Sequence, residues 1–249
     1  MSLREAAHLL DRSHTTLSQW QTGKRVPEPE DVSALLAVLR VTGRRRDEIM
    51  NLARHHYEAN WLAAGLDGMS GAVECERNAT EITEWQPLII PGPLQTTEYA
   101  GAIIGANPTL SSSEVHAQVG IRLGRYQTLK DRGDVRATAL IGEYAFRQRV
   151  GGLKAMLGQL DHLLRLIAED FFEIRVVPGE IGWHAGLIGP FLIYNFNVTP
   201  SIVLVEHHRT SAFLYGDAEV DRYKVALSDL RKLALSRDDS VAVIKEVRG

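Results

Sequence analysis

The sequence predicts an α+β protein in which a small all-helical domain precedes a larger domain of mixed helices and strands. Apolar residues recur at helical spacing through about the first 64 positions. Beyond a glycine-rich stretch, short apolar runs typical of strands are separated variously by helices and by short loops, which favours α+β over a regular doubly wound sheet. We therefore expect domains at residues 1–64 and 75–249, joined by a linker at residues 65–74.

Two short helices joined by a tight turn are predicted at the start of the chain. Ser2-Leu3-Arg4-Glu5 fits a capping box that begins the first helix. Asp11-Arg12-Ser13 forms the turn, in which Asp11 can adopt the left-handed conformation. Ser13 is a favoured N-cap for the second helix, and Gly23 supplies its left-handed stop. The buried positions follow at helical spacing: Leu3, Ala6, Ala7, Leu10, Leu17 and Trp20. A small residue, Ala7, at the crossing of two helices joined in this way is typical of a helix-turn-helix.

The other face of the second helix carries short or hydrogen-bonding side chains. A helix that lies in a major groove needs residues that approach base edges closely, with phosphate-binding cations just beyond them. The predicted base-contacting residues are His14, Thr15, Ser18 and Gln19. The predicted phosphate-contacting residues are Ser13, Thr22, Lys24 and Arg25.

Residues 2–40 resemble the Cro/repressor-like (XRE) helix-turn-helix proteins. The matching features are Ala7, Leu17 and Trp20 at the buried spacings, and Thr22-Gly23-Lys24-Arg25 followed by Pro27. The resemblance implies double-stranded DNA as a partner. That family has a further helix before this pair, and only Met1 precedes Ser2, so we expect the first helix to be missing. An intact DNA-binding motif and a regulator that has lost DNA binding are both compatible with this departure.

Two more helices complete the predicted first domain. Pro29 suits a first helical position, with Glu30 and Asp31 near the positive end of the dipole. The predicted buried stripe is Val32, Leu35, Leu36 and Leu39. A fourth helix is expected from about Arg45 to Ala64, with inward residues Ile49, Leu52, Ala53, His56 and Trp61. The Arg44-Arg45-Arg46 cluster at its start is interpreted either as a phosphate contact or, more commonly, as a solvated charge run.

The second domain alternates predicted strands and helices. Strands are expected at residues 81–90, 135–141, 172–177, 189–196 and 202–205. Helices are expected at residues 94–104, 112–129, 153–167 and 218–235. Residues 75–245 are similar to the C-terminal domain of actinobacterial Scr-type, toxin–antitoxin-like transcriptional regulators. The segments that carry this likeness are Trp85–Ala100, Arg147–Gly152 with Gln159-Leu160, Val177-Pro178, Gly189–Phe191 and Ala234–Ser236. The resemblance implies a small protein partner encoded nearby.

The composition of the chain bears on DNA binding, on cysteine and metal chemistry, and on membrane insertion. The formal net charge of −3 means that any DNA binding rests on a local patch and on dimerisation. Cys75 is the only cysteine, and its acidic neighbours predict a quiet thiol. A metal site at Glu206–Arg209 with His184 is disfavoured, because neighbouring strand residues point to opposite faces and no ligand spacing is present. We expect no cofactor, no metal, no membrane span and a cytoplasmic location.

The sequence therefore predicts a DNA-binding transcriptional regulator that uses its C-terminal domain for dimerisation, effector binding or partner binding. The alternative is an antitoxin-like interaction module that binds a small protein from a neighbouring gene, with DNA binding secondary or lost. An enzyme is the third possibility, and we do not expect it because no catalytic arrangement is recognisable.

Overall fold

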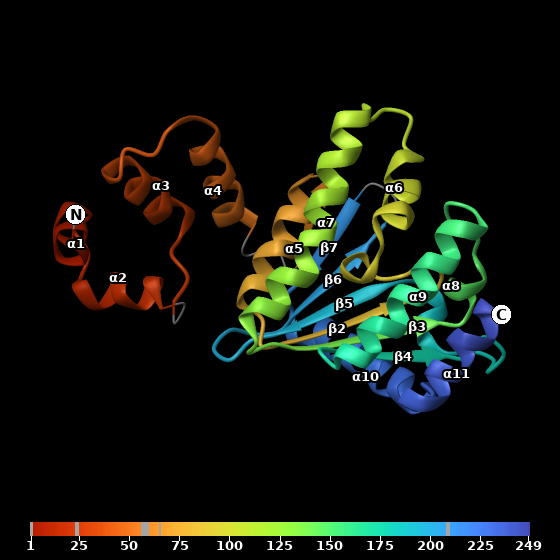
Figure 1. Ribbon diagram of the computed structural model, residues 1–249. Helices are drawn as coiled ribbons and strands as arrows, with labels where there is room; N and C mark the ends of the chain where they lie inside the picture. The colour runs from red at the N-terminus through yellow and green to blue at the C-terminus, as the bar shows by residue number, and fades with distance from the viewer. Residues whose placement is uncertain (1, 23–24, 56–59, 65, 208–209) are drawn as a thin grey trace. The chain divides into compact units, whose positions relative to one another are not determined.

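The computed structural model describes residues 2–22, 25–55, 60–64, 66–207 and 210–249, and the chain divides into two compact units, Met1–Trp61 and Leu62–Gly249 (Figure 1). The first unit contains four helices within its described residues: α1 (Leu3–Leu9), α2 (His14–Gln21), α3 (Pro29–Val38) and α4 (Gly43–His55). Its first helix begins with the expected capping box, since Ser2 Oγ accepts the Glu5 backbone N–H at 3.2 Å and Glu5 Oε2 accepts that of Ser2 at 2.7 Å. Asp11 has φ of 51°, so the turn takes the predicted left-handed residue.

Two small apolar clusters stabilise this unit. The first joins α1 to α2 and is formed by Ala6, Ala7 and Leu17, with Leu3, Leu10 and Trp20 partly buried against it. The second joins α3 to α4 and is formed by Val32, Leu36 and Met50, with Val41, Ile49 and Ala53 partly buried against it. The expected burial of Leu39 is wrong: it is the C-cap of α3, past the last full turn, and remains 49% exposed.

The long helix predicted from Arg45 to Ala64 is shorter in the structure. It ends at His55, and residues 60–64 form strand β1 instead. A short apolar run is ambiguous between helix and strand, and here pairing within the sheet decides the outcome. Of the residues expected to face inward, His56 lies outside the described residues, as do the side chains of Leu52 and Trp61.

A seven-stranded mixed sheet forms the centre of the second unit, in the order β1-β7-β6-β5-β2-β3-β4. Its strands are β1 (Asn60–Ala64), β2 (Glu81–Gln86), β3 (Arg136–Gly142), β4 (Phe172–Val177), β5 (Phe191–Asn195), β6 (Ile202–Glu206) and β7 (Thr210–Leu214). Strands β2, β3 and β4 are parallel, whereas β2 pairs antiparallel with β5, and the β5–β6 and β6–β7 pairs are also antiparallel. With the helices around it, this sheet confirms the predicted α+β class.

Helices cover both faces of the sheet (Figure 1). They are α5 (Leu66–Asn78), η1 (Gly92–Leu94), α6 (Thr97–Gly105), α7 (Ser112–Arg132), α8 (Tyr144–Arg147), α9 (Leu153–Glu169), η2 (Ala185–Ile188), α10 (Asp217–Leu233) and α11 (Arg237–Arg248). Side chains alternate along β2, so Trp85 faces the α10 side and packs with Val220, Leu227 and Leu230. Glu84 and Gln86 therefore face the opposite side, which α5, α7 and α9 cover.

Several predicted elements of this unit differ from those observed. The strand expected at residues 81–90 ends at Gln86, and the described part of the chain adds β1, β7, α5, α8 and α11 to the predicted set, together with the short helices η1 and η2. Residues 66–74 of the expected linker belong to α5. Glycine at position 71 is needed there because a Cβ atom would lie 2.6 Å from the Phe213 ring, so this glycine indicates close packing and not a loop. No described helix is both long enough and apolar enough to cross a membrane.

Candidate nucleic-acid interface

The start of α2 is fixed by its N-cap. Ser13 Oγ accepts the backbone N–H of Thr16 at 3.0 Å and lies 2.8 Å from Thr16 Oγ1. This confirms Ser13 as the N-cap, a role that stabilises a helix by about 1 kcal/mol. Its hydroxyl oxygen is therefore engaged within the helix, and the predicted phosphate contact of Ser13 would be made alongside this capping bond.

The inner face of α2 packs on α1, and the turn before α2 is joined to α3. Leu17 is 3% exposed and Ala7, on α1, is 4% exposed, so the two helices approach closely at the predicted crossing. Arg12 donates from Nε and Nη2 to Asp31 Oδ1 on α3 at 3.0 and 2.8 Å. Trp20 packs on the same cluster as Leu17, and its buried indole N–H has no hydrogen-bond acceptor among the described residues. Trp20 therefore belongs to the interior, as predicted, although it is only partly buried.

The outer face of α2 presents the four predicted base-contacting side chains to different degrees. His14 and Thr15 are exposed at the front of the helix, and Ser18 and Gln19 are partly buried one turn later. All four side chains can both donate and accept hydrogen bonds, and all are short except for the larger ring of His14. The four side chains remain predicted base contacts.

Of the predicted phosphate-contacting residues, Thr22, Lys24 and Arg25 follow α2 in the sequence, whereas Ser13 precedes it. Arg25 is exposed, and its backbone N–H donates to Gln19 O at 3.2 Å, which holds it near the helix end. Lys24 lies outside the described residues, as does the predicted stop, Gly23. Thr22 is the C-cap, and its Oγ1 donates to Ser18 O at 2.8 Å, so this hydroxyl must leave the helix before it can donate to a phosphate.

Charge on this segment has one sign. Between Asp11 and Glu28 the sequence contains Arg12, Lys24 and Arg25 and no carboxylate. Asp31 neutralises Arg12, which leaves the two cations beyond α2 to supply the local positive field. A basic loop after a polar helix face is the combination that phosphate and base contacts require together. In the separate Arg44–Arg46 cluster, Arg46 donates to Ser33 Oγ at 2.9 Å and so has a structural role.

The first unit is therefore a helix-turn-helix domain of the DNA-binding class, and residues 1–49 match the family described as a helix-turn-helix domain. Residues 69–246, more than half of the chain, match the family described as a domain of unknown function, DUF5753, and the chain belongs to that family.

One solved structure similar to the chain is that of the archaeal chromatin protein TrmBL2. The two are 15% identical over 88% of this chain and 67% of the other, with a TM-score of 0.39, which does not establish a shared fold. No curated protein matches the chain.

A buried charged cluster on the α7 side of the sheet was not predicted. Arg125 Nε donates to both carboxylate oxygens of Glu76 at 3.0 Å, and the pair joins α7 to α5. Burial raises the pKa of Glu84, on β2 beneath them, to about 7, and the hydrogen bond that Gln86 Nε2 donates to it at 3.0 Å offsets this only in part. The Tyr194 hydroxyl is also buried, with no hydrogen-bond partner among those residues. The sequence signal for this cluster is weak, since Glu84 alternates normally along its strand.

The residues considered above as a reactive thiol or as metal ligands form no reactive site among the described residues. Cys75 is buried, and burial together with Glu76 and Glu74 raises the pKa of its thiol to about 12, as expected of an unreactive cysteine. The described residues contain no group of three or more side chains that could hold a metal ion. Of the residues considered as a metal site, His208 and Arg209 lie outside the described part of the chain.

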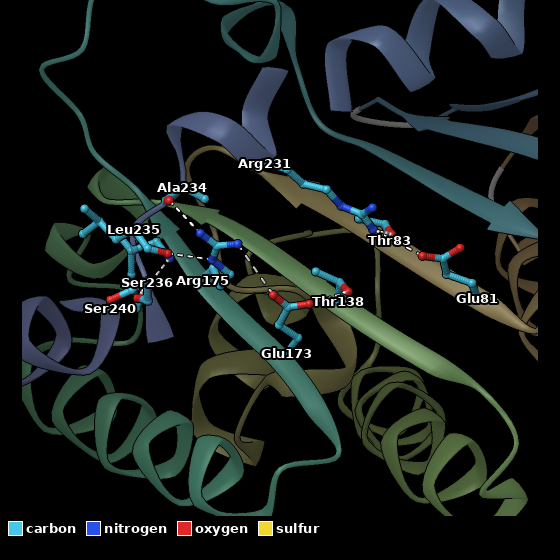
Figure 2. A network of polar contacts seen from close by, with 11 residues as sticks. Glu81, Thr83, Thr138, Glu173, Arg175, Arg231, Ala234, Leu235, Ser236 and Ser240 are labelled. Carbon is cyan, nitrogen blue, oxygen red and sulfur yellow. Dashed lines mark hydrogen bonds and ion pairs between the residues drawn. The ribbon is translucent and has the colours of Figure 1, made fainter. Parts of the chain in front are cut away.

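A groove of about 600 Å³ crosses β2, β3 and β4 on the side of the sheet that α10 covers. Figure 2 shows that two of its arginines, Arg231 and Arg175, are held by protein groups. Arg231 contacts Glu81 and Thr83 at 3.3 and 3.1 Å, and Arg175 donates to the carbonyls of Leu235 and Ala234 at 2.6 and 2.7 Å. These two guanidinium groups join α10 to the sheet and cap the end of that helix, so their donors have a structural role.

Proposed function

We propose that the protein is a transcriptional regulator that reads double-stranded operator DNA with α2. His14, Thr15, Ser18 and Gln19 contact base edges, and Ser13, Thr22, Lys24 and Arg25 contact phosphates. The observation that carries the proposal is that α2 packs on α1 through the buried Leu17, while its polar outer face and following basic loop carry no carboxylate. A rigid polar helix face with flanking cations is what major-groove recognition needs.

The proposal extends to the second unit, which supplies dimerisation and the binding of an effector or of a small protein partner. Two copies place two recognition helices on half-sites about one helical turn apart, roughly 34–36 Å. A dimer also compensates for the net negative charge of the chain, because it doubles the number of phosphate contacts per complex. We place the chain among cytoplasmic Cro/repressor-like regulators of the Scr type, without a catalytic role.

Replacing Gln19 with Ala tests the base contacts. A good bidentate contact to a base contributes about 1–3 kcal/mol of discrimination, so specific binding should weaken by roughly 5- to 150-fold while binding to random duplex changes little. The measurement is a titration of both duplexes by fluorescence anisotropy. Gln21→Ala is the matched control. Gln21 is exposed, and because it follows the buried Leu17 by four residues it lies on the same side of α2 as Leu17, away from the predicted contact face. Equal losses on both duplexes would exclude Gln19 as a base contact.

Replacing Arg25 with Ala tests the phosphate contacts. One lost phosphate contact should reduce the slope of log K against log salt by about one and weaken specific and random binding alike. Arg77→Ala, at a 64% exposed side chain on α5, removes a positive charge outside the predicted interface and should leave the slope unchanged. If the Arg25 variant keeps the wild-type slope, this side chain does not touch the backbone.

A further inference from the structure

An exposed apolar surface lies beside α10 in the second unit. It is formed by three side chains of the segment that includes η2 and by one on α10: Trp183 (76% exposed), Leu187 (55%), Ile188 (80%) and Val225 (64%). We call these four residues the Trp183 surface. From Ile181 to Phe191 the sequence contains no aspartate, glutamate, lysine or arginine. Exposed apolar groups that gather on one face mark interaction sites, and depletion of charge distinguishes the centre of an interface from its rim. Arg222 of α10 lines the same hollow as Ile188, so one charged side chain lies beside this segment.

The Trp183 surface is held rigidly by its buried neighbours. His184 is 9% exposed, and its ring packs edge-on against Trp85 at a centroid distance of 5.9 Å. Trp85 Nε1 donates to Gly186 O at 2.8 Å, and a Cβ atom on Gly186 would lie 2.8 Å from the same indole ring. Because His184 and Gly186 pack against the core, the backbone of this segment is fixed and the side chains beside them face outward. A surface that is already ordered loses little conformational entropy on binding.

Protruding and hollow features lie next to each other on this face. Trp183 and Ile188 protrude, and a hollow of about 220 Å³ lies between the η2 segment and α10. Its lining includes Phe191, Val205 and Tyr223 and is mainly apolar. An isologous interface uses the same patch on both subunits, so that each protrusion must meet a hollow on an identical surface. The Trp183 surface has both.

The charges along α10 complement a second, antiparallel copy of the same helix. Val225 is the central residue of Asp217–Leu233, so a two-fold axis beside it places the first half of one helix against the second half of the other. The first turn carries Asp217 and Glu219, and the last turn carries Lys232, whereas Arg231 is held by Glu81 and Thr83 of the sheet and takes no part. The exposed ion pairs within the helix, such as Asp229–Lys232 at 2.9 Å, are weak enough to rearrange on association.

We propose that a second copy of this chain binds through the Trp183 surface, about a two-fold axis that passes close to Val225. This inference rests on the proposed function, since the dimer supplies the second recognition helix. A standard interface buries about 800 Å² per partner, so the four apolar residues form its centre and the charged side of α10 forms part of its rim.

Ile188→Asp and Val225→Asp in the full chain test this surface by sedimentation equilibrium. The wild-type chain should be dimeric at micromolar concentration, and each substitution should raise the dimer dissociation constant at least tenfold. Ile121→Asp is the matched control: Ile121 is a 47% exposed isoleucine on α7, which covers the other side of the sheet, and its replacement should leave dimerisation unchanged. Circular dichroism checks that each variant is folded.

Charge exchange and cross-linking test the geometry independently. Arg222 and Asp229 lie seven residues apart on α10, about 10.5 Å along its axis, so they do not pair within one chain. Arg222→Asp and Asp229→Arg should each weaken the dimer, and the double variant should recover it. Val225→Cys should form a disulfide-linked dimer on oxidation, whereas Ile121→Cys should not; the native Cys75 is buried and stays unreactive.

A monomeric wild-type chain, a dimer that tolerates Ile188→Asp, or a Val225→Cys variant that does not cross-link would each overturn the proposal. Occupation of the surface by a different protein partner, with the chain itself monomeric, would overturn it as well. None of these results depends on DNA, so failure of this interface is distinguishable from failure of the proposed function, which the Gln19 experiment tests.

Discussion

Replacing Arg125 with Met should destabilise the protein by about 3–5 kcal/mol, because it leaves a buried carboxylate without its partner. The side chains of Arg125 and Glu76 are 15% and 5% exposed, and Arg125 Nε donates to both Glu76 oxygens. The pair connects α7 to α5, and Arg132 on α7 further caps α5 by donating to the carbonyls of Glu76 and Ala79. We expect α5 to lose its attachment to α7 first, with a reduced free energy of unfolding in urea.

Two further variants separate the buried pair from charge effects in general. The double variant Glu76→Met with Arg125→Met removes both charges of the pair and should be much more stable than Arg125→Met alone. Lys130→Met breaks the exposed Lys130–Glu169 pair, whose side chains are 40% and 42% exposed, and should cost less than about 1 kcal/mol. A loss below about 1 kcal/mol for Arg125→Met would show that Glu76 is hydrated or protonated in the folded protein.

Replacing Glu84 with Gln should stabilise the protein above neutral pH by up to about 3 kcal/mol and change little near pH 4. Burial raises the pKa of Glu84 to about 7 from an ordinary value of 4.5, and each pKa unit corresponds to about 1.4 kcal/mol. The glutamine is uncharged at every pH, so it avoids the cost of ionising a buried acid. The charged groups near Glu84 are Arg125, Arg122, Glu206 and Glu76, of which only the two arginines favour its ionised form.

The direction of the pH dependence follows from proton binding. Unfolded chains lose the Glu84 proton near pH 4.5, whereas the folded protein keeps it until about pH 7. The native state binds more protons in that window, so this residue makes the free energy of unfolding fall as pH rises through it and stay level above it. Urea unfolding of wild type and Glu84→Gln across pH 4–8 measures the difference, with Glu173→Gln on the exposed edge strand as the control. Parallel curves for wild type and Glu84→Gln would contradict a buried, proton-retaining Glu84.

The first unit could be predicted well because its information is local. Ser2, Ser13 and Glu5 form their caps within three residues, and the turn at Asp11 needs only a residue that tolerates positive φ. Ala7 and Leu17 could be assigned to a helix crossing because a helix presents a fixed face. Burial near helix ends was harder to predict. Leu39 follows the helical spacing of Val32 and Leu36 but lies past the last turn of α3.

The second unit depends on contacts between distant residues, and there the sequence was less informative. Residues 60–64 form a strand only because the sheet offers a partner. Gly71 looks like part of a linker, although its small size serves packing against Phe213. The buried cluster joins Glu76 to Arg125 across 49 positions, and no local pattern marks either residue as buried. The predicted DNA contacts on α2 are made to a molecule outside the chain, so no contact within the protein selects among its exposed side chains.

Selection of bound duplexes from a random DNA pool, with the full chain and then with Gln19→Ala, tests the central claim most directly. Recognition by α2 in a dimer predicts an enriched inverted repeat whose half-site centres lie about 10–10.5 base pairs apart. The Gln19→Ala variant should lose preference at the same position of each half-site while it still binds DNA. A folded wild-type chain that enriches no sequence would contradict the claim that this helix-turn-helix reads an operator.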